Sequence, residues 1–181
     1  MLKRILERGA RAFGRKYEYD VSYMLDVIEA STGAGLRLTL FPKLVGYRGP
    51  RTGQGVVAGA ALASTIEGDC GPCAQLVVDM LMEAGVPAAP LQACVDGRAQ
   101  DAGDIGLGFR FAMAAITDSG ETDALAQDIT DRFGRKTLIA ASYGAASGRF
   151  YPVFKRGLGH GAVCQRLSFS GAGDVLVNAH G

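Results

Sequence analysis

Two cysteines three residues apart mark the place where one predicted helix ends and another begins. Residues 54–66 are rich in alanine and contain no charged side chain, which is typical of a helix buried on nearly all sides. After the cysteines, apolar residues recur at helical spacing until Gly85-Val86-Pro87: Leu76, Val77, Met80, Leu81 and Ala84. The sequence therefore predicts two helices joined by a short break that carries Cys70 and Cys73.

The rest of the chain repeats the helical pattern. We expect further helices over residues 19–30, 36–47, 90–95, 105–116, 121–133 and 135–147, the last continuing weakly to Phe154. Residues 31–35 should break the first of these, and residues 46–55 should form a loop. We predict one all-α bundle, with an N-terminal helical extension (about 1–50), a core (about 55–161) and a loosely ordered tail (168–181) that contains one edge strand at 175–177.

Composition excludes several classes of partner. With 19 basic and 18 acidic residues in 181, the net charge is +1, so no nucleic acid partner is expected. The longest apolar runs are too short for a membrane span. Residues 1–16 are predicted to form a basic amphipathic helix. We expect its charged face to contact solvent and not a membrane surface. Four cysteines are too few for a secreted disulfide scaffold, which favours a reducing, cytoplasmic location.

The spacing of Cys70 and Cys73 suits a redox dithiol, because two such thiols can share one helical turn and form a reducible disulfide. We place Asp69 at the N-cap, so that the helix dipole favours a thiolate at Cys70. Glu67 and Asp69 oppose that thiolate unless one of them acts as its base. Inert packing is the main alternative. A metal is disfavoured because zinc needs two more ligands, and we expect no cofactor.

The chain resembles the alkylhydroperoxidase D and carboxymuconolactone decarboxylase superfamily between about Val56 and Pro87. The supporting residues are the buried helix that ends in Glu67-Gly68-Asp69, the dithiol that opens the next helix, and Glu83-Ala84-Gly85-Val86-Pro87 at its end. The resemblance implies an all-helical protein that forms trimers or larger rings. It also implies that Cys73 attacks a peroxide and that Cys70 resolves the sulfenic acid, whereas the helix dipole favours Cys70 as the nucleophile.

The chain departs from that family at two positions. Where the peroxidase members carry a proton-relaying glutamate and histidine, this chain has Ala58 and Val77. A base would have to come from Glu67, Asp69 or Asp79, or from His160 if the fold brings it near. The motif Cys-Gly-Pro-Cys also equals that of thioredoxin, but the chain has no Trp and predicts helix, not strand, before the motif.

These patterns predict a thiol–disulfide oxidoreductase with Cys70, Cys73 and Glu67 as catalytic residues. Its expected partners are a small-molecule oxidant or peroxide, a dithiol reductant protein and further copies of the chain. A catalytically inactive oligomeric binding or scaffold protein and a decarboxylase-like member of the same superfamily are the alternatives. Cys94 and Cys164 are isolated in the sequence and are expected to serve packing.

Overall fold

The computed structural model describes residues 1–160, 166–169 and 172–176, and this part of the chain is predominantly helical, as predicted. The helices are α1 (Leu2–Lys16), α2 (Ser22–Ala30), α3 (Thr32–Val45), α4 (Gln54–Glu67), α5 (Gly71–Glu83), α6 (Ala88–Val95), α7 (Gly103–Thr117), α8 (Thr122–Phe133), α9 (Arg135–Ser147) and α10 (Phe150–Gly157). Two 3-10 turns, η1 (Arg51–Gly53) and η2 (Ala99–Asp101), and two strands, β1 (Arg166–Phe169) and β2 (Ala172–Leu176), complete the described elements.

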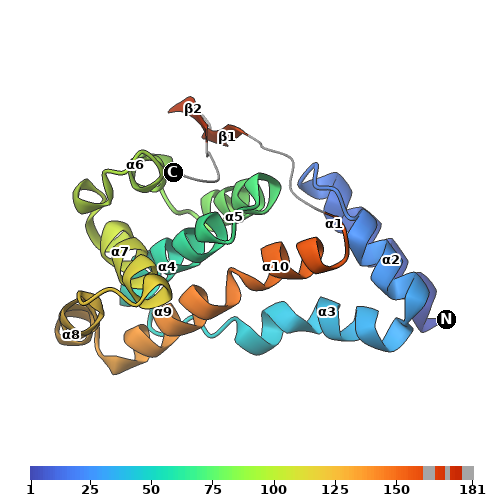
Figure 1. Cartoon of the computed structure of the whole chain (residues 1–181), viewed down its shortest axis with the longest axis horizontal. Helices are drawn as coiled ribbons and strands as arrows, with labels where there is room; N and C mark the ends of the chain where they lie inside the picture. Colours follow the sequence, from blue (N-terminus) through green and yellow to red (C-terminus); the bar gives the residue numbers. More distant parts are fainter. Residues whose placement is uncertain (161–165, 170–171, 177–181) are drawn as a thin grey trace.

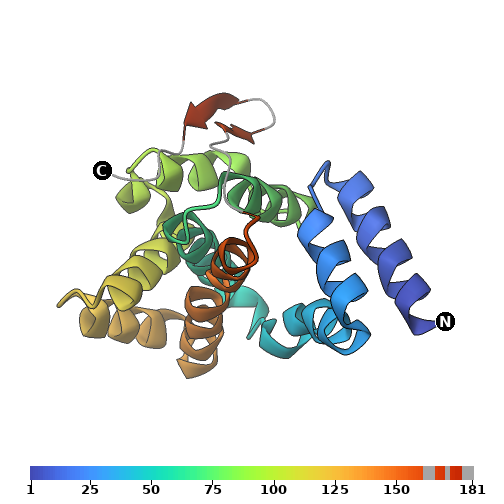
Figure 2. The same ribbon diagram turned by 45° about the vertical axis from the view of Figure 1, so that its right-hand side comes forward.

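Helix α4 lies at the centre of the molecule and packs against α5, α7 and α9 (Figure 1). Helix α8 packs against α7 and α9 on one side, while α1, α2 and α3 lie together on the other side, and Figure 2 shows the same division. Helix α3 runs back to contact α9. The N-terminal helices are therefore a distinct layer beside the central helices.

The alanine-rich helix predicted to be buried is α4, and its burial is confirmed. Val56, Ala60 and Leu62 have no exposed surface. The close approach of α4 to α7 depends on glycine: a Cβ atom on Gly59 would overlap the carbonyl of Ile105. Small residues bring the two backbones together, which explains why this stretch has no charge and little bulk.

The break predicted over residues 31–35 occurs in the N-terminal layer but is confined to Ser31, because residues 32–35 already form the first turn of α3. Ser31 is the N-cap of α3, and its hydroxyl accepts a hydrogen bond from the backbone N–H of Ala34, 3.3 Å away. Gly35 lies against Ile28 of α2, where a Cβ would clash. The glycine thus permits two helices to pack closely, and its presence does not signal a turn here.

The C-terminal segment forms an antiparallel pair of strands, where the sequence predicts one edge strand. Leu167 and Phe169 of β1 are buried in a cluster with α5, α6 and α7. The side chain of Gln75 on α5 bonds the backbone of Ser168 twice, accepting from its N–H at 2.7 Å and donating to its carbonyl at 3.1 Å. Val177 lies outside the described residues.

Among the described residues, no helix is both long and apolar enough to cross a bilayer.

Candidate disulfide site

Cys70 and Cys73 are joined by a disulfide at the start of α5, with their Cα atoms 5.2 Å apart. The helix begins at Gly71, so Cys70 itself is the N-cap, one residue later than the predicted cap at Asp69. Asp69 instead has a left-handed backbone, with φ 57°, which turns the chain sharply before the helix. Cys73 is consequently the third residue of α5, close to its free backbone amides.

The disulfide is enclosed by aromatic and apolar side chains. Only 5% of Cys70 and 4% of Cys73 is exposed. Their cluster brings together residues of the N-terminal layer and of α10: Phe13, Tyr17, Tyr19, Val21, Tyr23, Met24, Val27, Leu38, Phe150, Tyr151 and Phe154, with Leu76 of α5. The N-terminal layer and α10 therefore cover the sulfur atoms in this state.

Two polar side chains reach the disulfide from distant parts of the sequence. The hydroxyl of Tyr19 lies 3.4 Å from Sγ of Cys73, and Nζ of Lys155 donates a hydrogen bond to the same hydroxyl at 3.3 Å. Burial raises the pKa of Tyr19 to about 12, an effect opposed by a hydrogen bond from Tyr23. Burial also lowers the pKa of Lys155, while Asp20 acts in the opposite direction.

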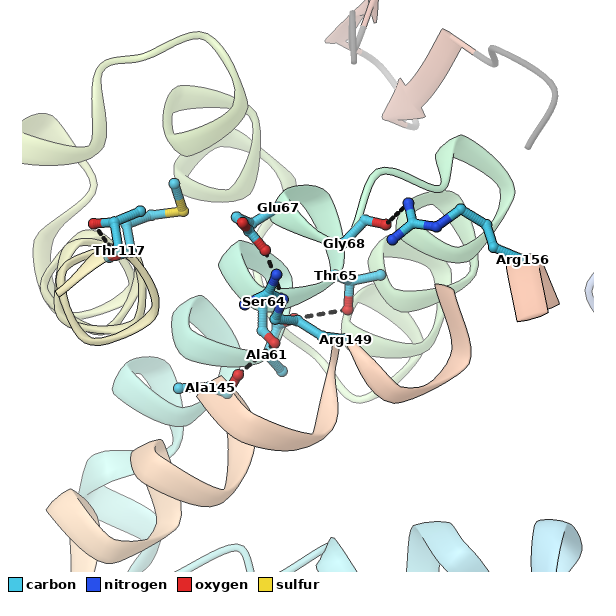
Figure 3. A network of polar contacts seen from close by, with 10 residues as sticks. Ala61, Ser64, Thr65, Glu67, Gly68, Thr117, Ala145, Arg149 and Arg156 are labelled. Carbon is cyan, nitrogen blue, oxygen red and sulfur yellow. Dashed lines mark hydrogen bonds and ion pairs between the residues drawn. The ribbon is translucent and has the colours of Figure 1, made fainter. Parts of the chain in front are cut away.

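Helix α10 is held in place by contacts to the connection between α4 and α5 (Figure 3). Arg149 forms an ion pair with Glu67, with Nε 2.7 Å from Oε2, and Arg156 donates a hydrogen bond to the carbonyl of Gly68 at 2.9 Å. A Cβ on Gly68 would stand 2.8 Å from Pro152. These contacts fix α10, and with it Lys155, beside the start of α5.

Glu67, predicted as a catalytic base, has Arg149 as its partner. The Oε2 atom of Glu67 is buried and, among the described residues, its contact with Arg149 is an ion pair without hydrogen-bond geometry. No contact joins Glu67 to either sulfur in the described part of the chain. The structure thus gives this carboxylate a positioning partner at the N-cap of α10, and its role as a base stays a prediction.

Two of the other candidate bases, Asp79 and His160, have partners away from the disulfide. Asp79 accepts a hydrogen bond from Gln75 at 2.7 Å. His160 lies at the end of α10 with Nε2 2.6 Å from Asp26 and Nδ1 3.3 Å from Ser22. The fold brings His160 against α2, and its described contacts do not include the cysteine sulfurs.

Cys94, the other cysteine in the described part of the chain, lies apart from the pair. Cys94 is a buried free thiol in the cluster around α5, α6 and α7, and burial raises its pKa to about 11, so it stays protonated at neutral pH. Cys164 lies outside the described residues. Within the described ranges, no group of three or more His, Cys, Asp or Glu side chains is arranged to hold a metal ion.

Tyr19 and Lys155 carry no signal in the sequence that would mark them as site residues. The two residues are 54 and 82 positions from Cys73, respectively, and belong to no motif. Tyr19 is the first residue of the helix predicted over residues 19–30, and Lys155 follows an aromatic run that continues the predicted helix 135–147 only weakly. Only the packing of the N-terminal layer and α10 against α5 brings them together.

The fold and this site define a helical protein with a buried cysteine pair at a helix start. Comparison of the chain with protein-family models, with curated proteins and with solved structures found no match in any of the three. The resemblance to the alkylhydroperoxidase D superfamily therefore stays a prediction from the sequence.

Proposed function

We propose that the protein is a thiol–disulfide oxidoreductase that cycles Cys70 and Cys73 between a disulfide and a dithiol. The observation that carries this proposal is the disulfide itself, formed between residues three apart at the first turn of α5. Helix amides at such a position favour a thiolate, which is the reactive form in thiol–disulfide exchange.

The reaction transfers two electrons and two protons. A dithiol donor is oxidised to its disulfide while the Cys70–Cys73 bond is reduced to two thiols. In the opposite direction, a peroxide is a suitable oxidant: one thiolate attacks the peroxide oxygen, the O–O bond breaks and an alcohol leaves. The second thiol then attacks the sulfenic sulfur and expels water, which restores the disulfide.

Burial of both sulfurs means that the donor reaches them only when the covering side chains move, or when the donor is small. The cover is formed by the end of α1, the turn before α2, residues of α2 and α3, and the aromatic residues of α10. Tyr17 of this cluster and its exposed neighbour Lys16 bind the exposed side chain of Glu83 at the far end of α5. Surface contacts of this kind open more readily than the packed centre around α4.

The test is reduction of the folded protein. Purified protein is equilibrated in dithiothreitol buffers of graded redox ratio, and the free thiols are trapped and counted by mass spectrometry while circular dichroism confirms that the chain stays folded. We expect a reversible two-electron transition assigned to Cys70 and Cys73, absent in Cys70→Ser and Cys73→Ser and retained in the control Cys94→Ser. Peroxide consumption with the same donor then tests whether a peroxide reoxidises the dithiol.

A structural disulfide in a binding or scaffold protein is the second candidate, and the low exposure of both sulfurs favours it. The same titration distinguishes the two. A pair that is reduced only when the protein unfolds would refute the oxidoreductase and leave the disulfide as a crosslink between the start of α5 and the chain before it.

A further inference from the structure

Lys155 is a buried cation without a buried anion beside it. Only 6% of the residue is exposed, and its Nζ lies 5.0 Å from the ring centroid of Tyr19 and 5.2 Å from that of Tyr23. Within the described residues, no carboxylate lies within ion-pair distance of this ammonium group. The two rings offset part of the unfavourable burial of this charge, and an anion that forms nearby would stabilise the ammonium group further.

The hydrogen bonds around Tyr19 lead from this cation to the disulfide. An ammonium group can only donate, so the Tyr19 oxygen accepts from Lys155. The one O–H of Tyr19 is then available to donate to Sγ of Cys73, 3.4 Å away. A disulfide sulfur is a weak acceptor, whereas a thiolate accepts a charge-assisted hydrogen bond. The donor and the cation are thus better matched to reduced Cys73 than to the disulfide.

We propose that Tyr19 and Lys155 form a thiolate-binding pair, in which the Tyr19 hydroxyl binds the sulfur of reduced Cys73 and the Lys155 ammonium supplies the counter-charge behind it. This inference rests on the proposed function, and it assigns different roles to the two cysteines. Tyr19 touches the reacting sulfur and is a catalytic residue; Lys155 acts through Tyr19 and is a positioning residue.

The assignment defines the order of bond changes. A donor thiolate attacks Sγ of Cys70, the donor–Cys70 bond forms, and the Cys70–Cys73 bond breaks with its electron pair on Cys73. The donor's second thiol loses its proton to solvent and attacks the donor sulfur of the mixed disulfide, and Cys70 leaves and takes up a proton. The donor ends as a disulfide, Cys70 as a thiol and Cys73 as a thiolate bound by Tyr19.

Few other charges face this pair. The titratable groups around it are Tyr23 of α2, Tyr151 of α10 and Asp20 of the turn before α2. His160 lies behind Tyr23, with ring centroids 6.3 Å apart, and bonds Asp26 and Ser22. Burial raises the pKa of both tyrosines, so at neutral pH neither carries charge. Asp20 is exposed and hydrogen-bonded to Ser22. The described surroundings therefore leave Lys155 as the cation nearest to a Cys73 thiolate through Tyr19.

The test measures thiolate formation at each cysteine separately. Cys94→Ser and Cys164→Ser are introduced first, so that only the pair reacts. The reduced protein, its Tyr19→Phe and Lys155→Met variants and the control Tyr151→Phe are alkylated with iodoacetamide over a range of pH, and peptide mass spectrometry gives the midpoint for each sulfur. The control removes a buried hydroxyl from the same cluster without touching Cys73 in the described contacts.

We expect Cys73 to have the lower midpoint in the parent protein. Tyr19→Phe and Lys155→Met should each raise that midpoint by about one pH unit, which is roughly tenfold less thiolate at a fixed pH, and should leave the Cys70 midpoint unchanged. Lys155→Arg should preserve most of the effect because it keeps the charge. Tyr151→Phe should behave as the parent.

Unchanged Cys73 midpoints in both Tyr19→Phe and Lys155→Met would overturn the thiolate-binding pair while leaving the redox cycle intact. If one variant fails to fold, as judged by circular dichroism, the other still decides the question. Both variants interrupt the same series of contacts, from Lys155 through Tyr19 to Cys73. A pair that resists reduction in the folded parent protein refutes the proposed function instead, and this inference falls with it.

Discussion

Lys16 at the end of α1 forms an ion pair with Glu83 at the end of α5, with Nζ 2.6 Å from Oε1. Tyr17 donates a hydrogen bond to the other oxygen of the same carboxylate. Two donors from the N-terminal layer thus bind one side chain of the helix that carries the disulfide. Because Tyr17 also packs in the cluster around Cys70 and Cys73, loss of this contact should make the sulfurs easier to reach.

Glu83→Gln should therefore speed reduction of the disulfide by dithiothreitol at low salt. We expect an increase of about twofold, because exposed ion pairs are individually weak, and a smaller increase at high salt, which screens them. The matched control is Asp104→Asn, which breaks an exposed ion pair with Arg132 on the opposite side of the molecule. Equal rates in parent and Glu83→Gln would show that this contact does not hold the cover.

The same contact predicts a dependence on pH. Hydrogen bonds from Lys16 and Tyr17 lower the pKa of Glu83 below its ordinary value of 4.5. A lowered pKa means that the contact stabilises the closed form above pH 4.5 and is lost as the pH falls through the lowered value. With a phosphine reductant, which works in acid, the difference in rate between parent and Glu83→Gln should shrink as the pH falls below 4.5 and vanish once Glu83 is protonated. A difference that persists in acid would contradict the ion pair as its cause.

Lys155→Met should change stability differently in the two redox states. In the oxidised protein the substitution removes a buried charge and keeps the volume, so the free energy of unfolding should rise by about 1–2 kcal/mol. In the reduced protein the gain should be smaller, because the charge stabilises the Cys73 thiolate. Urea unfolding of both states measures the effect, and Lys136→Met on the exposed surface of α9 is the control.

The sequence predicted the helices well because their apolar residues recur at helical spacing and their ends carry glycine, proline or polar residues. It located the cysteine pair, since both members lie within one turn. It could not locate Tyr19 or Lys155, whose positions depend on how two remote segments pack against α5. It also misread Gly35, because the same residue type serves both a turn and a close helix crossing, and only the neighbour Ile28 distinguishes them.

Gly59→Ala should destabilise the protein by about 1–3 kcal/mol or more, because the added methyl group overlaps the Ile105 carbonyl and forces α4 and α7 apart. Gly9→Ala is a matched control: Gly9 lies in α1 with no atom near its missing Cβ, so alanine should stabilise that helix by up to about 1 kcal/mol. Thermal unfolding measures both. Equal stability of Gly59→Ala and parent would contradict the close α4–α7 crossing.

Glu67→Gln tests whether Glu67 acts as a base for the cysteine thiols. The substitution weakens the ion pair with Arg149 and loosens α10, so we expect a loss of about 1–2 kcal/mol in urea unfolding, as for other partly buried charged contacts. Because Glu67 contacts Arg149 and neither sulfur among the described residues, the alkylation midpoint of Cys73 should stay close to that of the parent. A shift as large as that of Tyr19→Phe would instead restore Glu67 to the role of base that its place in the sequence predicts. Arg149→Met is the control, since it loosens α10 equally and leaves the carboxylate in place.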